Sequence, residues 1–293
     1  EVLLGTKVMT CDNAAAVLPF GAIDTPTQGG TAAGTGFFNF GWALTPLTGT
    51  IPTDGSTVRV FVDGVPVGSL SEPPNVYDQY RPDVSTLFPG LNNTAGPVGA
   101  FFLNTTAYEN GAHTIAWSAT DNLGRSDGIG SRYFNIVNAG ASPAPPRKDG
   151  VPLSAEESRR LRNAPLFPAG PIRFAQGYDP GPAREKLLPD GTGVHRVEIP
   201  QTGRIEIALG EGEAGAFSRR PAPPGPVRGY LAVGEELRPL PIGSTLDAAT
   251  GRFSWMPGPG FLGTYDLMFF GGAGPDVSRI AAISVTVKPH GSR

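Results

Sequence analysis

The sequence predicts an all-β fold made of two β-sandwiches, and three observations support this. Apolar and polar residues alternate with the two-residue period of a strand in many short segments. Glycine and proline punctuate these segments, with 41 glycines and 31 prolines in the chain. A length of 293 residues suits two domains of ordinary size.

The clearest hairpin lies at residues 244–255. Asp247 can accept hydrogen bonds from the backbone ahead of it and open a turn, and Gly251 can adopt the positive φ that closes it. The strand that follows alternates polar and apolar residues up to Trp255. The same period returns over residues 263–270, so this stretch predicts consecutive strands of one sandwich.

Residues 20–138 are predicted to form the first sandwich and residues 194–287 the second. The expected strands of the first are 21–24, 37–44, 57–62, 65–70, 99–104, 113–120 and 131–137. Those of the second are 194–199, 204–209, 229–233, 252–255, 263–270 and 279–287. Residues 1–19 read as an N-terminal arm, either an edge strand or a frayed leader, and residues 288–293 as a disordered tail.

The segment 139–193 has the composition of a Pro/Gly-rich connector. Its first ten residues are rich in proline, which makes a linker stiff and extended. Ser154 can cap a helix with Glu157 three residues later, so one short helix is expected there.

Two sets of motifs resemble known families. Residues 246–265 contain Leu-Asp-x-x-Thr-Gly, an aromatic strand, Pro and then Gly-x-Tyr, and this run resembles the putative-Ig, cadherin-like modules of large bacterial surface and secreted proteins. Residues 23–26, 40–44, 60–64, 81–84 and 111–114 together resemble an Ig-like module of bacterial secreted and surface proteins. The resemblance implies tandem Ig-like sandwiches in an exported bacterial protein, located outside the cell or on its surface.

Composition argues against several partners. The net charge of −3 gives no basic field for nucleic acid, and no apolar run approaches the roughly 20 residues of a transmembrane helix. The lone Cys11 cannot form an internal disulfide, and it has no basic neighbour that would activate a thiol. No secretory signal is evident at the start, so the chain is cytosolic, already processed or part of a longer polypeptide, and we favour the last two.

No catalytic spacing stands out, so we expect a protein that is not an enzyme and has no cofactor. His113, His195 and His290 show no metal-ligand spacing. The loop 121–128 offers three oxygen ligands, but it lacks a closing Glu and contains Arg125, which favours a plain hairpin loop over a calcium site. A hydrolase would need carboxylates brought together only in three dimensions, with Asp54, Asp63, Glu72 and Asp78 as candidates.

The tryptophans allow two interpretations. Trp42, Trp117 and Trp255 stand in the middle of predicted strands beside small or apolar residues. This favours core packing between sheets over a platform for stacking sugars.

Residues 71–98 are the predicted functional surface, because a 28-residue excursion without strand period usually has a role. A helix is expected to start at Pro82, with Val84, Leu87 and Phe88 docked on the sandwich. The remaining residues have the composition of an interface, and we take them as candidate binding residues: Tyr77, Tyr80, Arg81, Asn92 and Asn93. The alternative is that the excursion only covers a sheet edge.

The favoured function is therefore a non-enzymatic extracellular structural or adhesion protein, a subunit or C-terminal portion of a larger surface assembly, with a protein partner or self-assembly. The alternative is a glycan-binding accessory region of a secreted enzyme.

Overall fold

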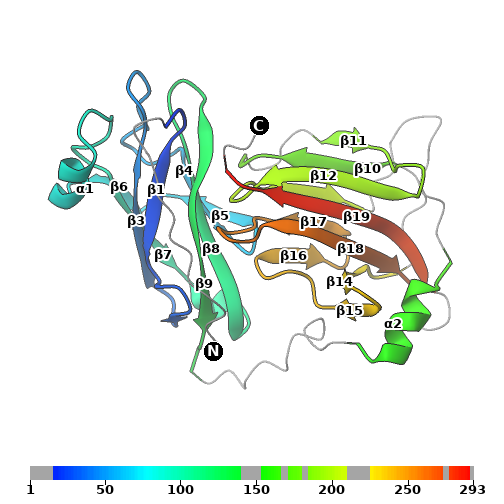
Figure 1. The fold of residues 1–293 in the computed structure, drawn as a ribbon. Coiled ribbons are helices and arrows are strands. Elements are labelled where there is room, and N and C mark those ends of the chain that lie inside the picture. Colours follow the sequence, from blue (N-terminus) through cyan, green and yellow to red (C-terminus); the bar gives the residue numbers. More distant parts are fainter. Residues whose placement is uncertain are drawn as a thin grey trace.

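The computed structural model describes residues 16–139, 153–165, 171–179, 184–209, 225–272 and 277–290. Two β-sandwiches follow one another along the chain, accompanied by two short α-helices (Figure 1). The predicted all-β class and the tandem sandwich architecture are confirmed. Cys11, most of the predicted arm and the start of the connector lie outside the described residues.

The first sandwich pairs a four-stranded sheet, β1-β3-β7-β6, with a five-stranded sheet, β2-β9-β8-β4-β5. The strands are β1 Phe20–Thr25, β2 Thr31–Ala32, β3 Phe37–Leu44, β4 Val58–Val62, β5 Val65–Ser69, β6 Val76–Gln79, β7 Val98–Leu103, β8 Gly111–Thr120 and β9 Ser126–Ile136. Helix α1, Pro82–Leu87, lies between β6 and β7. All seven predicted strands are present, and the short β2 and β6 are additions.

The second sandwich pairs two five-stranded sheets, β11-β10-β13-β17-β16 and β12-β19-β18-β14-β15. The strands are β10 Ile172–Gln176, β11 Glu185–Leu187, β12 Val194–Pro200, β13 Ile205–Ala208, β14 Arg228–Val233, β15 Glu236–Arg238, β16 Ser244–Asp247, β17 Arg252–Trp255, β18 Gly263–Gly271 and β19 Ser278–Lys288. All six predicted strands are present.

Both sandwiches share one topology. Replacing β1 by β10, β2 by β12 and β3–β9 by β13–β19 converts the strand order of the first into that of the second. In both, a strand near the start pairs in parallel with the last strand, β2 with β9 and β12 with β19. Only β11 has no counterpart.

The shared topology shows that the second sandwich begins earlier than the sequence suggested. Strands β10 and β11 lie within the predicted connector 139–193, yet Arg173–Gln176 of β10 pair with the whole of β13. Ile172 of β10 is buried and Phe174 packs against the second core. The apolar–polar alternation of β10 is short and flanked by Pro and Gly, which is why this strand was predicted to be part of the linker.

The hairpin predicted at residues 244–255 is formed by β16 and β17. The Asp247 carboxylate accepts hydrogen bonds from the backbone N–H groups of Ala249 and Thr250, at 2.9 and 3.2 Å. Gly251 has φ of +69° and donates its N–H to the Asp247 carbonyl at 2.8 Å. Both turn residues therefore do what their chemistry predicted.

Each core is built around a fully buried tryptophan, as predicted for Trp117 and Trp255. The Trp117 indole N–H donates to the side-chain oxygen of the buried Asn39 at 2.8 Å, which links β8 to β3 and so one sheet to the other. Antibody-type domains join their sheets with a disulfide. In this chain, which has one cysteine, a buried polar bond joins the sheets instead.

Helix α2, Ala155–Arg162, confirms the capping box predicted at Ser154. The Ser154 hydroxyl accepts from the Glu157 N–H, and the Glu157 carboxylate accepts from the Ser154 N–H. Leu161 of the helix is buried in a small cluster with Leu237 and Phe270 of the second sandwich. The helix therefore packs on the second domain, at the end far from the first (Figure 1). Neither helix in the described ranges has the length and apolar character needed to cross a membrane.

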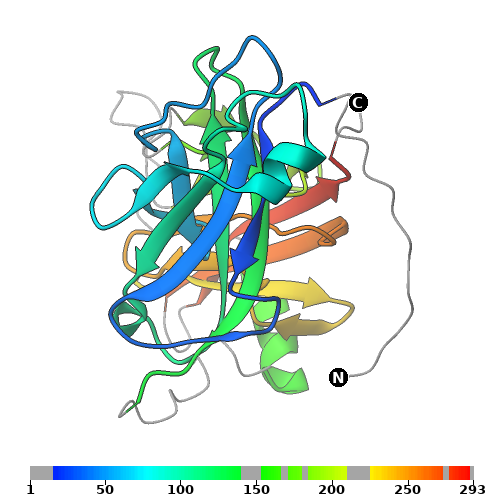
Figure 2. The same ribbon diagram turned by 90° about the vertical axis from the view of Figure 1, so that its left-hand side faces the viewer.

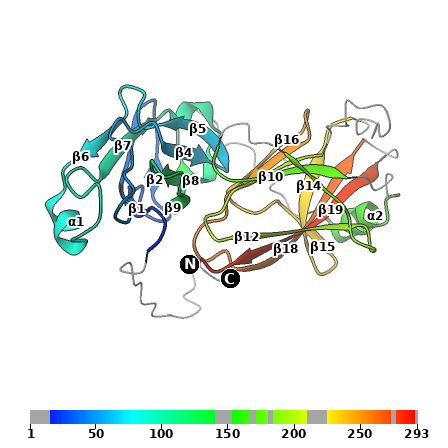
Figure 3. The same cartoon turned by 90° about the horizontal axis from the view of Figure 1, so that it is seen from above.

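One end of the second sandwich packs against the outer face of the five-stranded sheet of the first (Figures 1 and 3). Phe61 of β4 and Ala116 of β8 are buried together with Met256 of the second domain, and Tyr178 packs on this cluster. Phe61 also lies under the Arg204 guanidinium, 5.7 Å from ring centre to Cζ. The two domains thus share a small apolar interface.

The β4–β5 turn is inserted into the second domain. Thr245 donates its hydroxyl to the Asp63 carbonyl at 2.8 Å, and Arg204 donates Nε–H to the Gly64 carbonyl at 2.7 Å. Gly64 has φ of +76°, and a Cβ there would lie 2.9 Å from the Trp255 Cα. The turn fits against backbone, so no larger residue can be accommodated without movement.

The C-terminal end makes a second link between the domains, and this corrects the prediction of a disordered tail from residue 288. Lys288 closes β19 and forms an ion pair with Glu198 at 2.5 Å. His290 Nε2 lies 2.7 Å from the Asp127 carboxylate of the first domain, and this hydrogen bond raises the pKa of His290. Tyr178 donates its hydroxyl to the Thr202 carbonyl beside this pair, at 3.2 Å.

Candidate functional site

The four-stranded sheet of the first sandwich has an aromatic outer face. Residues alternate across β3, so Phe38, Phe40 and Trp42 share one face while Asn39 and Ala43 point into the core. This face is turned away from the second domain (Figures 1 and 2).

Helix α1 covers one half of this face, as Figure 2 shows. Phe88, just after the helix, packs against Phe20 and Trp42 with ring centroids 5.5 and 5.1 Å apart. Val84 is buried as predicted, but Leu87 is 69% exposed, so the expected three-residue docking face has two members. A single turn that ends at residue 87 points one of its apolar side chains to solvent.

The other half of the face is uncovered. Phe38 pairs directly with Phe102 of β7, and Phe40 lies opposite Ala100, which pairs with Val76 of β6. The Phe38 ring centroid is 5.4 Å from those of both Phe40 and Phe102. Phe38, Val76 and Phe102 are 46%, 41% and 37% exposed. We call Phe38, Phe40, Val76 and Phe102, together with the buried Ala100 opposite Phe40, the aromatic patch. Contiguous exposed apolar surface of this kind marks interaction sites.

Tyr77, a predicted binding residue, is buried instead of exposed. Its hydroxyl donates to the Ala43 carbonyl at 2.9 Å, and its ring belongs to the first core. Burial raises the pKa of Tyr77, so the phenol stays neutral. Period 2 within the short β6, which was not expected as a strand, points this ring inward.

Tyr80 and Arg81 differ in how free their side chains are to contact a partner. Tyr80 is among the most exposed large apolar side chains described, at 69%. Arg81 forms ion pairs with Asp83, at 2.9 Å, and with Asp24 of β1. The guanidinium therefore fastens the start of α1 to the sheet, and Tyr80 is the freer of the two.

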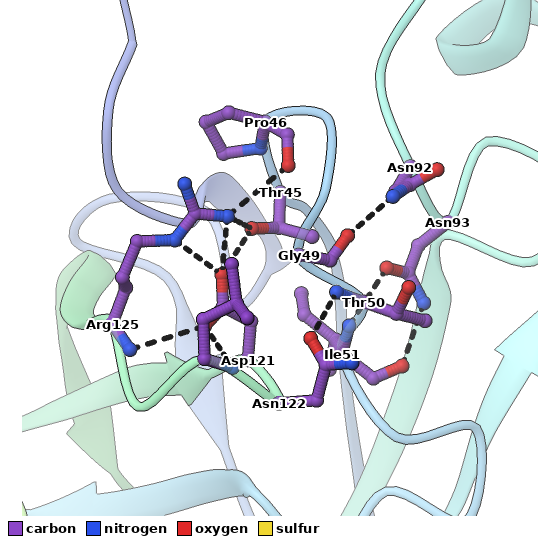
Figure 4. Close-up of polar contacts among 11 residues, drawn as sticks. Thr45, Pro46, Gly49, Thr50, Ile51, Asn92, Asn93, Asp121, Asn122 and Arg125 are labelled. Carbon is purple, nitrogen blue, oxygen red and sulfur yellow. Dashed lines mark hydrogen bonds and ion pairs between the residues drawn. The ribbon is translucent and has the colours of Figure 1, made fainter.

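Asn92 and Asn93 are used within the molecule (Figure 4). Asn92 donates to the Gly49 carbonyl. Asn93 exchanges two hydrogen bonds with the backbone of Ile51, at 2.8 and 2.9 Å, and has φ of +66°. Both side chains hold the loop that follows β3 instead of facing a partner.

The loop 121–128, which offered three possible calcium ligands, is a hairpin loop closed by an ion pair between Asp121 and Arg125 (Figure 4). One carboxylate oxygen of Asp121 accepts from the Thr45 hydroxyl at 2.9 Å and from Arg125 Nε at 2.7 Å. The other accepts from the N–H groups of Leu123 and Arg125, each at 3.0 Å. Burial alone would raise the pKa of Asp121, but the bonds from Arg125 and Thr45 outweigh it and lower the value. Among the described residues no cluster of metal-ligating side chains is present.

The other residues considered as catalytic, metal-binding or sugar-binding candidates make contacts within the protein. Trp42 is half-buried by the covering helix and is not a core residue like the other two tryptophans. His195 is buried, with Nδ1 3.2 Å from the Ala282 carbonyl. Asp54 binds the neighbouring Ser56, and Asp63 lies 2.6 Å from His113 Nδ1.

The aromatic patch was not predicted as a site, although its strand was. The signal was present in residues 37–40, Phe-Phe-Asn-Phe, where adjacent aromatics put large apolar rings on both faces of one strand. A strand with one solvated face shows polar residues at alternate positions. The outward-facing positions of β3 lack such polar residues, which predicts that both faces of this strand contact other apolar groups.

Comparisons with known proteins do not assign the chain to a family. No protein-family model matches the chain, and no match was found among curated proteins. Similar solved structures include the fibronectin(III)-like modules of Clostridium thermocellum CbhA, with 10% identity, 92% of this chain and 95% of that chain covered, and a TM-score of 0.25. The N-terminal Ig1-2 module of the Drosophila receptor protein tyrosine phosphatase DLAR has 10% identity and a TM-score of 0.23, with 92% of this chain and 99% of that chain covered.

Latent PorU from Porphyromonas gingivalis has 11% identity and a TM-score of 0.27, with 92% of this chain and 20% of that chain covered. Scores of this size carry no argument about function. The class of the chain therefore rests on its own sheets: it is a tandem pair of Ig-like β-sandwiches.

Proposed function

We propose that this chain is a non-enzymatic extracellular structural or adhesion module of an exported bacterial surface assembly, and that the aromatic patch is its protein-binding surface. The supporting observation is that half of the outer face of the four-stranded sheet carries exposed phenylalanines while α1 covers the other half. Aromatic side chains are enriched at the centres of protein interfaces.

The rest of the fold supports a role in presenting this surface. The patch faces away from the second domain, so that domain does not obstruct a partner (Figure 1). Hydrogen bonds at Gly64 and an ion pair at Asp127 fix the second domain behind it. A rigid tandem loses little conformational freedom when it assembles with a partner.

Glycan binding is the second candidate, favoured by the same exposed rings. Stacking on a sugar chain needs rings that lie in one plane, but Phe38 is tilted by 30° to Phe40 and by 57° to Phe102. Phenylalanine also lacks the polar group with which Tyr and Trp hydrogen-bond. The patch therefore suits an apolar protein surface better than a polysaccharide.

Site-specific photo-crosslinking in the producing cells tests the proposal. A photoreactive phenylalanine analogue would replace Phe38 or Phe102, with Leu188 of the second domain, also exposed, as the matched control position. We expect a discrete protein adduct from both patch positions and none from Leu188. Equal labelling at all three positions, or none at the patch, contradicts the proposal.

The double variant Phe38→Ser, Phe102→Ser should lose assembly while the melting temperature stays within about 3 °C, since both side chains are partly exposed. Leu188→Ser serves as the control. A glycan array separates the second candidate: sugar binding that disappears in the same double variant would replace the protein partner by a glycan.

A further inference from the structure

Two arginines flank Phe270 in the second sandwich, on three neighbouring strands. Arg228 begins β14 and pairs with Phe270 of β18, and Arg279 of β19 pairs with Phe270 from the other side. Residues paired directly across neighbouring strands present their side chains to the same face of a sheet. A strand spacing of about 4.8 Å places the two arginine Cα atoms about 10 Å apart, so both side chains are long enough to reach one ligand.

This face is the outer one, on which helix α2 packs at the end far from the first domain (Figure 1). Phe270 is fully buried in the cluster that contains Leu161 of the helix, and Val277, two residues before Arg279, belongs to the same cluster. The Arg279 backbone N–H donates to the Pro165 carbonyl, just after the helix, at 2.9 Å. The two half-buried arginines therefore lie beside a packed apolar cluster.

Neither guanidinium is neutralised by a carboxylate within the described ranges. Arg228 donates Nη2–H to the Gly272 carbonyl at 3.3 Å, an acceptor without net charge, and the Arg279 side chain has no acceptor in these ranges. The Nε atoms of both arginines are buried and unbonded there. A charge that is partly withdrawn from water is costly unless it is paired. This face thus carries two positive charges that the described residues leave uncompensated.

The opposite sheet of the same domain shows how two arginines are satisfied in this fold. Arg184 and Arg204 bind the two oxygens of the buried Glu206 carboxylate, and Arg204 Nη2 lies 2.8 Å from Oε2. Burial alone would raise the pKa of Glu206, but the bonds from both arginines outweigh it and lower the value. Arg228 and Arg279 form a similar pair without the carboxylate, and an oxyanion from a ligand would complete it.

A phosphate group matches this pair in charge and in shape. Two guanidinium groups carry two positive charges, and a phosphate monoester carries nearly two negative charges at neutral pH. Its three terminal oxygens accept several hydrogen bonds at once, and arginine can supply two parallel ones. A carboxylate supplies a single negative charge and would leave one guanidinium uncompensated.

We propose that Arg228 and Arg279 form a binding site for the phosphate group of a ligand. The Nη–H groups of both guanidiniums donate to the phosphate oxygens, and the anion removes the repulsion between the two like charges. Because both Nε atoms are enclosed, the arginine stems are held before the ligand arrives, and binding costs little side-chain freedom. The site belongs to the second domain and does not depend on the aromatic patch.

Titration of the full chain with inorganic phosphate tests the site. The titration is done at constant ionic strength and at about pH 8, where phosphate is a dianion. Binding is followed by backbone amide chemical shifts, with Gly271 and Ser278 as markers, because this pair adjoins Phe270 and Arg279. Acetate is the second probe, since it offers two oxygens and one charge. Methyl phosphate is the third, since it stands for a phosphate ester.

The variants are Arg228→Gln and Arg279→Gln. Arg196→Gln is the matched control, because Arg196 lies in the same sheet and is already paired with Asp190 at 2.8 Å. Neither variant removes an ion pair among the described residues, so each should melt within about 3 °C of the wild type in chloride buffer. If a variant does not fold, the wild-type comparison of phosphate with acetate still decides the proposal.

We expect saturable shifts at the markers with a Kd of about 1 mM or tighter for phosphate. Affinity should fall at least about tenfold in either variant and for acetate, and stay unchanged in Arg196→Gln. Methyl phosphate binding as tightly as phosphate assigns the site to a phosphate ester, and binding of phosphate alone assigns it to the free ion; both support the proposal. No saturation up to about 20 mM phosphate, acetate binding as tightly as phosphate, or an equal loss in Arg196→Gln would each overturn it.

Discussion

Gly64→Ala should uncouple the two domains. Gly64 has φ of +76°, and an added Cβ would lie 2.9 Å from the Cα and 3.0 Å from the N of Trp255. Both are backbone atoms of the second domain, so no side-chain rotation can relieve the contact. The turn must withdraw from the second domain, or the second domain must move away.

The cost has two parts. An L-residue at this φ costs about 1–2 kcal/mol. Withdrawal of the turn also breaks the hydrogen bonds that the carbonyls of Asp63 and Gly64 accept from Thr245 and Arg204. A neutral bond of this kind contributes about 1 kcal/mol and one from a charged donor about 1.5–3, so we expect a further loss of about 2.5–4 kcal/mol.

Gly124→Ala is the matched control. Gly124 has φ of +75°, and no atom lies within 4 Å of the site of its added Cβ. This variant carries the backbone strain alone. The difference in unfolding free energy between the two variants therefore isolates the contact between the domains.

Calorimetry of the full chain would measure both effects. The wild-type domains should melt as a coupled unit, and Gly64→Ala should separate the melt into two transitions. Gly124→Ala should lower the melting temperature without splitting the transition. If the two variants melt alike, Gly64 does not join the domains and the reasoning is wrong.

Two further outcomes follow from buried and interfacial groups. Trp255→Ala should destabilise the second domain by about 3–5 kcal/mol in chemical denaturation, because the ring is fully buried and its N–H bonds the Ile242 carbonyl; free quenching of Trp255 fluorescence by iodide would contradict this. The pKa of His290 is raised above its ordinary value of 6.5, so its ion pair with Asp127 is complete below pH 6.5 and is lost as the pH rises through the raised pKa. Wild-type stability relative to His290→Gln should therefore fall between pH 6 and pH 9, by less than about 1 kcal/mol because the ring is partly exposed, and a constant difference would remove His290 from the interface.

The local structure could be predicted where a residue determines its own backbone or that of near neighbours. Asp247 and Gly251 gave the hairpin, Ser154 and Glu157 the helix start, and period 2 gave thirteen of the strands. These are short-range effects, so a single sequence contains them. Strand β10 was missed because its alternation spans five residues next to glycines and prolines.

The candidate site could be predicted only in part. The excursion 71–98 was singled out by its length, and its helix starts at the predicted proline. The length of the excursion does not show which way each side chain points. The sequence therefore could not predict that Tyr77 is buried or that Asn93 is bonded to Ile51. Tyr80 alone of the five predicted residues is both exposed and unpaired among the described contacts.

The sequence by itself determined the class of this protein: two strand-rich domains, their turns and their core tryptophans, because hydrophobic period and turn chemistry are local. The tertiary structure decided which surfaces are covered by other elements and which stay exposed. Whether α1 covers all or half of the aromatic face depends on where Phe88 meets Phe20, residues 68 positions apart. The β4–β5 turn is held in place only because a second domain packs beside it: the Asp63 carbonyl accepts a hydrogen bond from Thr245, 182 positions along the chain, and no local pattern contains that contact.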